Sequence, residues 1–463
     1  MLNIPRILVA GTQSGVGKTS ITLGLARALA RKGVRVQPYK VGPDFLDPTY
    51  HRLASARQCY NLDGWMMGAD YSRELFTRTA SGADLALIEG VMGMYDSMTP
   101  GSLEGSSAQM ALLLQAPVAL VVDAGGMAGS LAAMAQGYDR YGGGNNVSGV
   151  IANRVGSADH AELLKNALRL GSAPPLVGAV GKGALPPLAR RHLGLVTAED
   201  QAATRQILEQ MADAVEAAVD LEALMALAKN APPLPAPSAG AEAPAKPLAR
   251  LGLASDSAFH FYYPDNLAAL EAAGLAIERF SPISDKRLPK GLDAIYFGGG
   301  YPEEFAGELS ENLSMLEDVR EFISSGRPVY AECGGLIYLS RGVEDRQGRR
   351  YPLVGKLASW TRMLDRFRAL GYVEATLTRP SLFGETGATL RGHRFHYSEL
   401  LEDPAAAPDW APAYRLVRAR TGQQADEGYQ CGRALASYAH IHFASAPGAA
   451  EKFAERILEV KAL

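Results

Sequence analysis

Residues 6–33 read RILVAGTQSGVGKTSITLGLARALARKG, and this stretch decides the fold of the first half of the chain. Its apolar opening predicts a short buried strand, and the spacing of apolar residues after Ser20 predicts an amphipathic helix. A glycine-rich turn that ends in Lys-Thr joins the two. Backbone N–H groups in such a turn, and at the start of the helix, face an anion. The stretch therefore predicts a phosphate-binding loop after the first strand of a parallel α/β sheet.

The residue types in this loop indicate how a nucleotide binds. Lys18 supplies a point charge for the β- and γ-phosphates of ATP, and the hydroxyl of Thr19 can bind Mg²⁺. The spacing departs from the common pattern, because Thr12 stands where the first glycine is expected and Gly11 lies one residue earlier. Asn153, at the end of a later predicted strand, could read the adenine edge or could simply form a turn. The predicted ATP-binding residues are Gly15, Gly17, Lys18, Thr19, Ser20 and Asn153.

Acidic residues follow two further predicted strands. YKVGPDFLDPTYH at 39–51 and IEGVMGMYD at 88–96 each begin in an apolar run and continue into carboxylates. Open α/β sheets bind their ligands at such strand ends. Mg²⁺ prefers an oxygen shell of one or two carboxylates, waters and phosphates. Asp44 and Glu89 are therefore predicted to lie at the metal with Thr19; the alternative is that both are solvated loop acids or caps.

A proline-rich segment divides the chain. Residues 231–248, APPLPAPSAGAEAPAKPL, hold six prolines in eighteen residues, which indicates a semi-rigid linker. Short apolar strands alternate with helices on both sides of it. We therefore predict two doubly wound α/β domains, a phosphate-loop domain at 1–230 and a second domain at 249–463. The predicted strands are 6–11, 34–42, 84–90, 118–123 and 147–155 before the linker, and 248–256, 276–282, 292–300 and 328–333 after it.

The second domain carries a candidate nucleophile in VYAECGGLIYLS, residues 329–340. Cys333 lies between a predicted strand and a helix start, among small residues, as in a nucleophile elbow. The helix N-terminus is expected to lower the pKa of this thiol and to favour the thiolate. The alternative is that Cys333 is a small buried hydrophobic residue.

A base and a set of oxyanion donors are also predicted near strand ends. SYAHIHFAS holds His440 and His442 after a strand-like run, and FGGGYPEEF is a glycine turn rich in N–H groups. Together with the cysteine they predict acyl transfer through a thioester. A zinc site built from these two histidines with His393 and His396 is the alternative, but no Cys-x2-Cys pattern accompanies them. The predicted oxyanion donors are Gly299, Gly300 and Gly334.

The bulk composition excludes several classes of protein. With 21% charged residues and a net charge of −3, the chain has no basic footprint for nucleic acid. The longest apolar stretch, at 110–122, is too short to cross a bilayer. The N-terminus lacks the apolar core of a signal peptide, and three widely spaced cysteines do not form a disulfide framework. A cytoplasmic protein is expected.

Nearly the whole chain resembles the cobyrinic acid and hydrogenobyrinic acid a,c-diamide synthase family, glutamine-dependent amidotransferases of corrinoid biosynthesis. KVGPDFLDP is the most telling stretch, since it looks like the a,c-diamide type and not like the related cobyric acid synthases. The N-terminal domain is similar to dethiobiotin synthetase, and the C-terminal domain to class I glutamine amidotransferases with a flavodoxin-like sheet. The motifs that carry the resemblance are GTQSGVGKTS, YKVGPDFLDPTYH, IEGVMGMYD, NRVGSADH, RRHLGL, FYYPDNL, FGGGYPEEF, AECGGLIYL, GHRFHYS and SYAHIHF.

The resemblance implies a ligase that uses ATP, Mg²⁺ and L-glutamine to amidate the a- and c-acetate carboxylates of a corrin, a tetrapyrrole. It implies Cys333 as the glutaminase nucleophile and His440 as its base. Two positions depart from expectation: His442 stands where class I enzymes place a glutamate, and Arg394 stands where Glu is expected. The resemblance places Asp44 and Glu89 near the metal, and puts Asp47 and Asp96 in stretches that the family uses around the tetrapyrrole carboxylate and the phosphate. Lys40, in the same stretch as Asp47, is predicted at the substrate or phosphate with them.

Other functions compete with this one. A nickel-sirohydrochlorin a,c-diamide synthase would use the same chemistry on another macrocycle. A P-loop switch or partition ATPase would carry a lysine early in the loop, where this chain has Gln13. A ligase fed by free ammonia would leave Cys333 with a structural role only. No nucleic acid or membrane partner is expected, and a homodimer could form through RRHLGL at 190–195 or the apolar helix DLEALMALA at 220–228.

Overall fold

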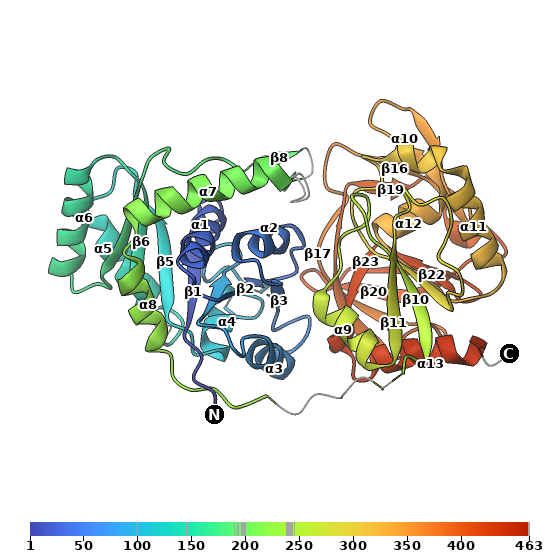
Figure 1. The fold of residues 1–463 in the computed structure, drawn as a ribbon, viewed down its shortest axis with the longest axis horizontal. Coiled ribbons are helices and arrows are strands. Elements are labelled where there is room, and N and C mark those ends of the chain that lie inside the picture. The colour runs from blue at the N-terminus through green and yellow to red at the C-terminus, as the bar shows by residue number, and fades with distance from the viewer. Residues whose placement is uncertain are drawn as a thin grey trace. The chain divides into compact units, whose positions relative to one another are not determined.

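The computed structural model describes the chain except for residues 100, 145–146, 189, 192–193, 196–200, 238–243, 245 and 462–463. It divides into two compact units, Met1–Ala239 and Gly240–Leu463 (Figure 1). Part of the predicted linker, and residues 192–193 of the RRHLGL stretch, lie outside the described residues. Among the helices that are described, none has both the length and the apolar character needed to cross a membrane.

The first unit is built on a parallel seven-stranded sheet in the order β3-β2-β4-β1-β5-β6-β7. Every residue of β1 is buried, as expected for a parallel sheet covered on both faces. The five strands predicted before the linker are present. Strands β3 and β7 were not predicted, because β3 is only three residues long and β7 is a small-residue run after two prolines. The strands are β1 Arg6–Gly11, β2 Val36–Val41, β3 Tyr60–Leu62, β4 Leu85–Glu89, β5 Val118–Asp123, β6 Val147–Val155 and β7 Leu176–Gly181.

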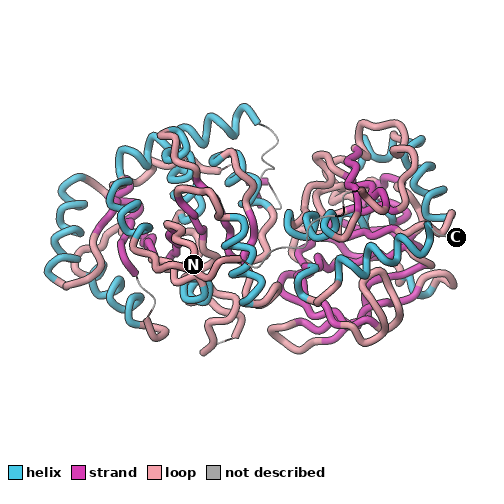
Figure 2. Tube along the Cα trace, turned by 60° about the horizontal axis from the view of Figure 1, so that its bottom comes forward, coloured by secondary structure: helices cyan, strands magenta, loops and turns pink. Residues whose placement is uncertain are grey.

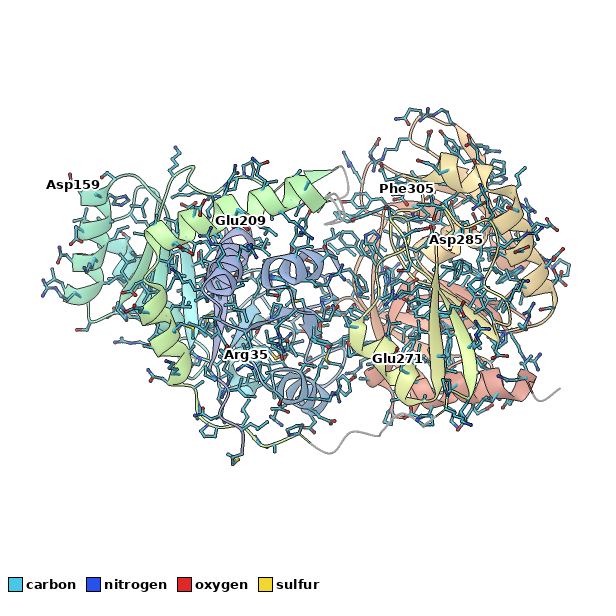
Figure 3. All side chains as sticks on the ribbon, in the orientation of Figure 1. Arg35, Asp159, Glu209, Glu271, Asp285 and Phe305 are labelled. Atoms are coloured by element: carbon cyan, nitrogen blue, oxygen red, sulfur yellow. The ribbon has the colours of Figure 1, made fainter. Side chains whose placement is uncertain are left out.

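Helices pack against the two faces of this sheet. On one face, Ile7 of β1 lies in the core that α1 and α7 cover. On the other, Tyr39 of β2 contacts Phe76 of α3 with ring centroids 5.0 Å apart. Glu209 on α7 (Figure 3) pairs with Arg27 of α1 at 2.5 Å and ties the two helices together. The helices are α1 Lys18–Arg31, α2 Leu46–Ser55, α3 Ala69–Thr79, α4 Ser107–Leu113, α5 Ser130–Arg140, α6 Ala158–Leu170, α7 Gln201–Ala218 and α8 Leu221–Lys229.

The second unit contains a mixed ten-stranded sheet in the order β11-β10-β12-β13-β22-β21-β20-β17-β18-β23. From β11 to β22 the strands pair in parallel, and from β22 to β23 they pair antiparallel. The four strands predicted after the linker are β10 to β13, and the strand-like run before His440 is β22. The antiparallel strands β17, β18, β20 and β21 were not predicted. The strands are β10 Ala249–Ala254, β11 Leu275–Phe280, β12 Ala294–Phe297, β13 Val329–Glu332, β17 Ala369–Leu377, β18 Thr389–His396, β20 Ala411–Arg418, β21 Gln424–Cys431, β22 Ala434–Ser437 and β23 Ala439–His442.

The strand register brings distant motifs of this unit together. Glu332 of β13 lies opposite Ser437 of β22, and His393 of β18 lies opposite His440 of β23. Cys333, directly after β13, therefore lies beside the turn from β22 to β23. Figure 2 shows helices packed along the strands of this unit. The remaining elements are α9 Pro264–Ala272, α10 Ala306–Glu311, α11 Leu313–Ser324, α12 Gly334–Leu339, α13 Ala449–Lys461, the short strands β8 Arg190–Arg191 and β9 Gly194–Leu195, and the four-stranded sheet of β14 Ser340–Glu344, β15 Arg350–Pro352, β16 Leu357–Met363 and β19 Ser398–Leu400.

Candidate functional site

The phosphate loop connects β1 to α1 in a conformation that requires glycine. Gly15 has φ 80° and Gly17, the residue before α1, has φ 101°, a region that other residues rarely adopt. A Cβ at Gly17 would also lie 2.4 Å from the side-chain nitrogen of Asn153. Asn153, at the end of β6, donates this nitrogen to the carbonyl of Val16 at 2.7 Å. The predicted adenine-reading residue is thus in contact with the loop and braces it, and its contact with adenine stays a prediction.

Lys18 and Thr19 contact the end of β4 and the loop that follows it. Lys18 donates to the carbonyls of Gln13 and Met92. Burial, and then the charge of Lys40, lower the pKa of Lys18. The hydroxyl of Thr19 donates to Oε1 of Glu89 at 2.5 Å. The structure therefore brings the loop together with the carboxylate at the end of β4, as the sequence predicts.

A buried charge cluster surrounds Glu89, and it includes a residue that the sequence analysis missed. Lys40 Nζ lies 2.7 Å from Glu89 Oε1 and 2.7 Å from Asp47 Oδ2. His51 Nε2 lies 2.5 Å from Glu89 Oε2, and both side chains are fully buried. Burial acts to raise the pKa of Glu89, but the charge of Lys40 and the hydrogen bond from His51 hold it below its usual range. His51 follows Asp47 by four residues on α2, a helical spacing that could have revealed it.

The fit to Mg²⁺ differs between the two predicted carboxylate ligands. Thr19 and Glu89 offer adjacent oxygens at the loop, which suits an ion that keeps waters and phosphates as its other ligands. Asp44 accepts from the N–H of Leu46 at 2.8 Å at the start of α2. Burial, and then the charge of Asp47, raise the pKa of Asp44 to about 8, so this carboxyl is protonated near neutral pH. A role for Asp44 as a metal ligand stays a prediction.

The predicted substrate residues near this loop have structural contacts of their own. Ser20 lies in the first turn of α1, partly exposed. Asp96 turns back and accepts from the N–H of Gly93 at 2.8 Å, which closes the loop after β4. Lys40 and Asp47 belong to the buried cluster, so their charges are balanced without a ligand. Contact of these side chains with substrate or phosphate stays a prediction.

The second site is a sharp turn at Cys333. The residue has φ 48° and ψ −93°, a strained conformation typical of a nucleophile elbow. A Cβ at Gly335 would lie 2.4 Å from the carbonyl oxygen of Phe297, so only glycine fits there. A Cβ at Gly334 would lie 3.1 Å from the backbone nitrogen of Gly300. The predicted oxyanion loop therefore packs directly against the turn that carries the thiol.

Burial decides the state of the Cys333 thiol, and the expectation of a lowered pKa is wrong. The residue is 6% exposed. Burial, followed by the charges of Glu303 and Glu332, raises the pKa of Cys333, and the opposing effects of the Gly334 N–H and Arg394 are smaller. Helix α12 is also only six residues long. The thiol is therefore protonated at rest, and a base must take its proton.

Alkylation of Cys333 is expected to report this raised pKa. Because the thiolate reacts, and its fraction rises with pH below the pKa, the rate of labelling by iodoacetamide should rise roughly tenfold per pH unit from about pH 6 to about pH 9. Peptide mass mapping measures labelling at Cys333, with Cys333→Ala as the blank. A rate that levels off near neutral pH would contradict a protonated resting thiol.

His440 reaches this thiol site from β23. Its imidazole is 2% exposed, and a Cβ at Gly299 would lie 2.4 Å from its Cε1, so the ring rests on the oxyanion loop. His393 of β18 stacks on it with ring centroids 5.0 Å apart. Nδ1 of His440 lies 3.7 Å from Oε2 of Glu332, the residue before the nucleophile. The structure thus brings the predicted base, loop and nucleophile to one place.

The two departures from expectation are also explained by contacts. His442 Nε2 lies 3.0 Å from Oδ2 of Asp265, and both side chains are fully buried. Arg394 contacts Nε2 of His396 at 3.0 Å. The described residues, which include all four of these histidines, contain no group of three or more His, Cys, Asp or Glu side chains that could hold a metal ion. The four histidines therefore do not form the alternative zinc site.

Comparison with known proteins matches this arrangement. Residues 7–182 match the family model of the CobQ/CobB/MinD/ParA nucleotide binding domain, and residues 250–448 match that of the CobB/CobQ-like glutamine amidotransferase domain. A cobyrinate a,c-diamide synthase from Syntrophotalea carbinolica is 50% identical over 454 residues, which cover 98% of this chain and 99% of that protein. Proteins of the same name from Leptospira interrogans and Salmonella typhimurium are each 40% identical, covering 99% and 95% of both chains. A phosphate loop and a cysteine elbow in one chain, and relatives that match both along their full length, show that the chain belongs to the cobyrinate a,c-diamide synthase family.

Proposed function

We propose that this chain is an ATP-dependent ligase that converts the a- and c-acetate carboxylates of cobyrinic or hydrogenobyrinic acid into amides, with glutamine as nitrogen donor. The observation that carries the proposal is the presence of two separate centres in one chain. One is a phosphate loop joined to a buried carboxylate, and the other is a cysteine elbow beside a histidine. A carboxylate needs activation before it forms an amide, and ammonia near neutral pH is mostly protonated, so each centre answers one of these needs.

In the glutaminase centre, His440 accepts the proton of the Cys333 thiol. The thiolate attacks the side-chain amide carbon of glutamine, and the oxyanion that forms is held by N–H groups of Gly299, Gly300 and Gly334. His440 returns the proton to the departing nitrogen, which releases ammonia and leaves a γ-glutamyl thioester. Water then hydrolyses the thioester to glutamate and frees the thiol.

In the ligase centre, a macrocycle carboxylate attacks the γ-phosphorus of ATP and yields an acyl phosphate and ADP. Lys18 and the loop N–H groups hold the phosphate charge during this transfer. Mg²⁺, held by Thr19 and Glu89, would neutralise further charge on the phosphates. Ammonia then attacks the acyl carbon and displaces phosphate, which forms the amide. In this proposal Lys40, Asp47 and Asp96 line the substrate side of the centre.

Mass spectrometry tests the substrate. The purified protein is incubated with ATP, Mg²⁺ and glutamine and with cobyrinic, hydrogenobyrinic or nickel-sirohydrochlorin carboxylate substrates in separate reactions. Each amide exchanges OH for NH₂ and lowers the mass accordingly, and two successive losses are expected with a corrin. If only nickel-sirohydrochlorin gave amide products, the substrate of the enzyme would be that macrocycle and not a corrin. Absence of product from all three substrates would overturn the proposal.

A further inference from the structure

We propose that Glu332, the residue before the nucleophile, is the carboxylate that orients His440 in the glutaminase centre. This inference rests on the proposed roles of Cys333 and His440. In class I enzymes a glutamate two residues after the histidine has this role, but here that position is His442, which pairs with Asp265 at 3.0 Å. The carboxylate that approaches His440 is instead Glu332, whose Oε2 lies 3.7 Å from Nδ1 of His440.

Three hydrogen bonds fix the position of the Glu332 carboxylate. Its Oε1 accepts from the hydroxyl of Tyr330 at 2.6 Å and from the N–H of Ile441 at 3.0 Å. Its Oε2 accepts from the hydroxyl of Tyr296 at 2.8 Å. Burial, and then the charge of Glu332, raise the pKa of both tyrosines, so both stay protonated donors. Three donors from β12, β13 and β23 thus hold this carboxylate beside Nδ1 of His440.

The geometry selects one tautomer of His440. A carboxylate facing Nδ1 favours a proton on that nitrogen, which leaves the lone pair of Nε2 to accept the thiol proton. It also stabilises the imidazolium that forms. At 3.7 Å the contact is longer than a hydrogen bond, and catalytic contacts of this kind often shorten only when substrate binds.

The two described histidines of β18 near His440 are neutral and differ in this from a carboxylate. Burial, and then the charge of His440, lower the pKa of His393 well below its ordinary value, so that stacked ring is neutral. Its Nδ1 faces the hydroxyl of Tyr263 at 3.1 Å. Burial lowers the pKa of His396 to about 3, so it too is neutral. The titratable groups whose interaction with His440 the structure gives are Glu332 at the end of β13, and His393 and His396 on β18.

The experiment compares Glu332→Gln with Glu332→Asp in the full-length enzyme. The amide can still accept from Tyr330 and Ile441, but its NH₂ would face Nδ1 and move the imidazole proton to Nε2. We expect kcat for glutamine hydrolysis to fall about 10²- to 10⁴-fold, with KM for glutamine and ammonia-dependent amidation unchanged. The acid limb of the pH–activity profile for the residual glutamine hydrolysis should move to lower pH, because the His440 imidazolium loses the adjacent negative charge. Glu332→Asp keeps the charge and should restore the acid limb and part of kcat.

Glu427→Gln is the matched control. Glu427 is another buried carboxylate of the same sheet, and it accepts from the hydroxyl of Ser437 at 2.7 Å and the N–H of Tyr438 at 2.6 Å. Its variant should leave the acid limb and the ratio of glutamine to ammonia activity unchanged. A glutaminase kcat for Glu332→Gln within threefold of the parent, or an equal change in Glu427→Gln, would overturn the inference. An equal fall of the glutaminase kcat in Glu332→Asp and Glu332→Gln would also overturn it, because it would indicate a structural role for Glu332. Cys333→Ala is assayed in parallel. If this variant still hydrolyses glutamine, the proposed nucleophile is wrong, and that outcome is distinct from a failure of the Glu332 inference.

Discussion

Cys333→Ala is expected to abolish amidation with glutamine while amidation with ammonium salts continues. The thioester cannot form without the sulfur, so glutamine hydrolysis should fall by more than about 10³-fold. The ligase centre lies in the other unit of the chain and takes ammonia as its nucleophile, so it does not depend on the thiol. The measurement is amide formation followed by mass spectrometry with each nitrogen source, together with glutamate release.

The control for this variant is Cys431→Ala, which removes a partly exposed thiol of the same unit. It should leave both activities unchanged. Full glutamine-dependent amidation by Cys333→Ala would exclude a catalytic thiol and would leave a ligase fed by free ammonia. Loss of both activities, with an unchanged unfolding temperature, would also contradict separate centres.

Lys18→Ala is expected to remove amidation from both nitrogen donors. In the proposed mechanism its ammonium is the point charge next to the transferred phosphoryl group, and loss of one such group typically lowers the rate about 10²- to 10³-fold. The loop itself should persist, because Asn153 still bonds to Val16 and the glycine conformations are unchanged. Amide formation with ammonia and ATP is the measurement.

Lys32→Ala provides the comparison for Lys18→Ala. Lys32 ends the same helix and is 53% exposed, with Glu216 at 3.7 Å, so its loss should change neither activity. Glutamine hydrolysis without ATP should survive in Lys18→Ala, since Cys333 and His440 are unaffected. A Lys18→Ala protein that still forms the amide from ammonia within threefold of the parent rate would remove the loop from the mechanism.

Local patterns were sufficient for much of this chain. The strand, glycine turn and helix at 6–33 are encoded by residues that are neighbours in sequence. The predicted strands β1, β2, β4, β5 and β6 are present, because short continuous apolar runs are typical of strands buried in a parallel sheet. The elbow at Cys333 is likewise local, since Gly335 is needed where the backbone approaches Phe297. The antiparallel strands β17, β20 and β21 were missed because many of their residues are only partly buried and their buried residues do not alternate strictly along the strand.

The sequence by itself determined which residues are the candidates for chemistry: the loop with Lys18 and Thr19, the carboxylate Glu89, and the pair of Cys333 and His440. Tertiary structure alone decided their protonation and their partners. Burial raises the pKa of Cys333 where a helix end was expected to lower it. Glu332 meets His440, which is distant in sequence, because β13 pairs with β22 and β23 follows β22 directly along the chain. Desolvation and contacts between distant strands depend on the packed fold, and neither leaves a signal in the spacing of nearby residues.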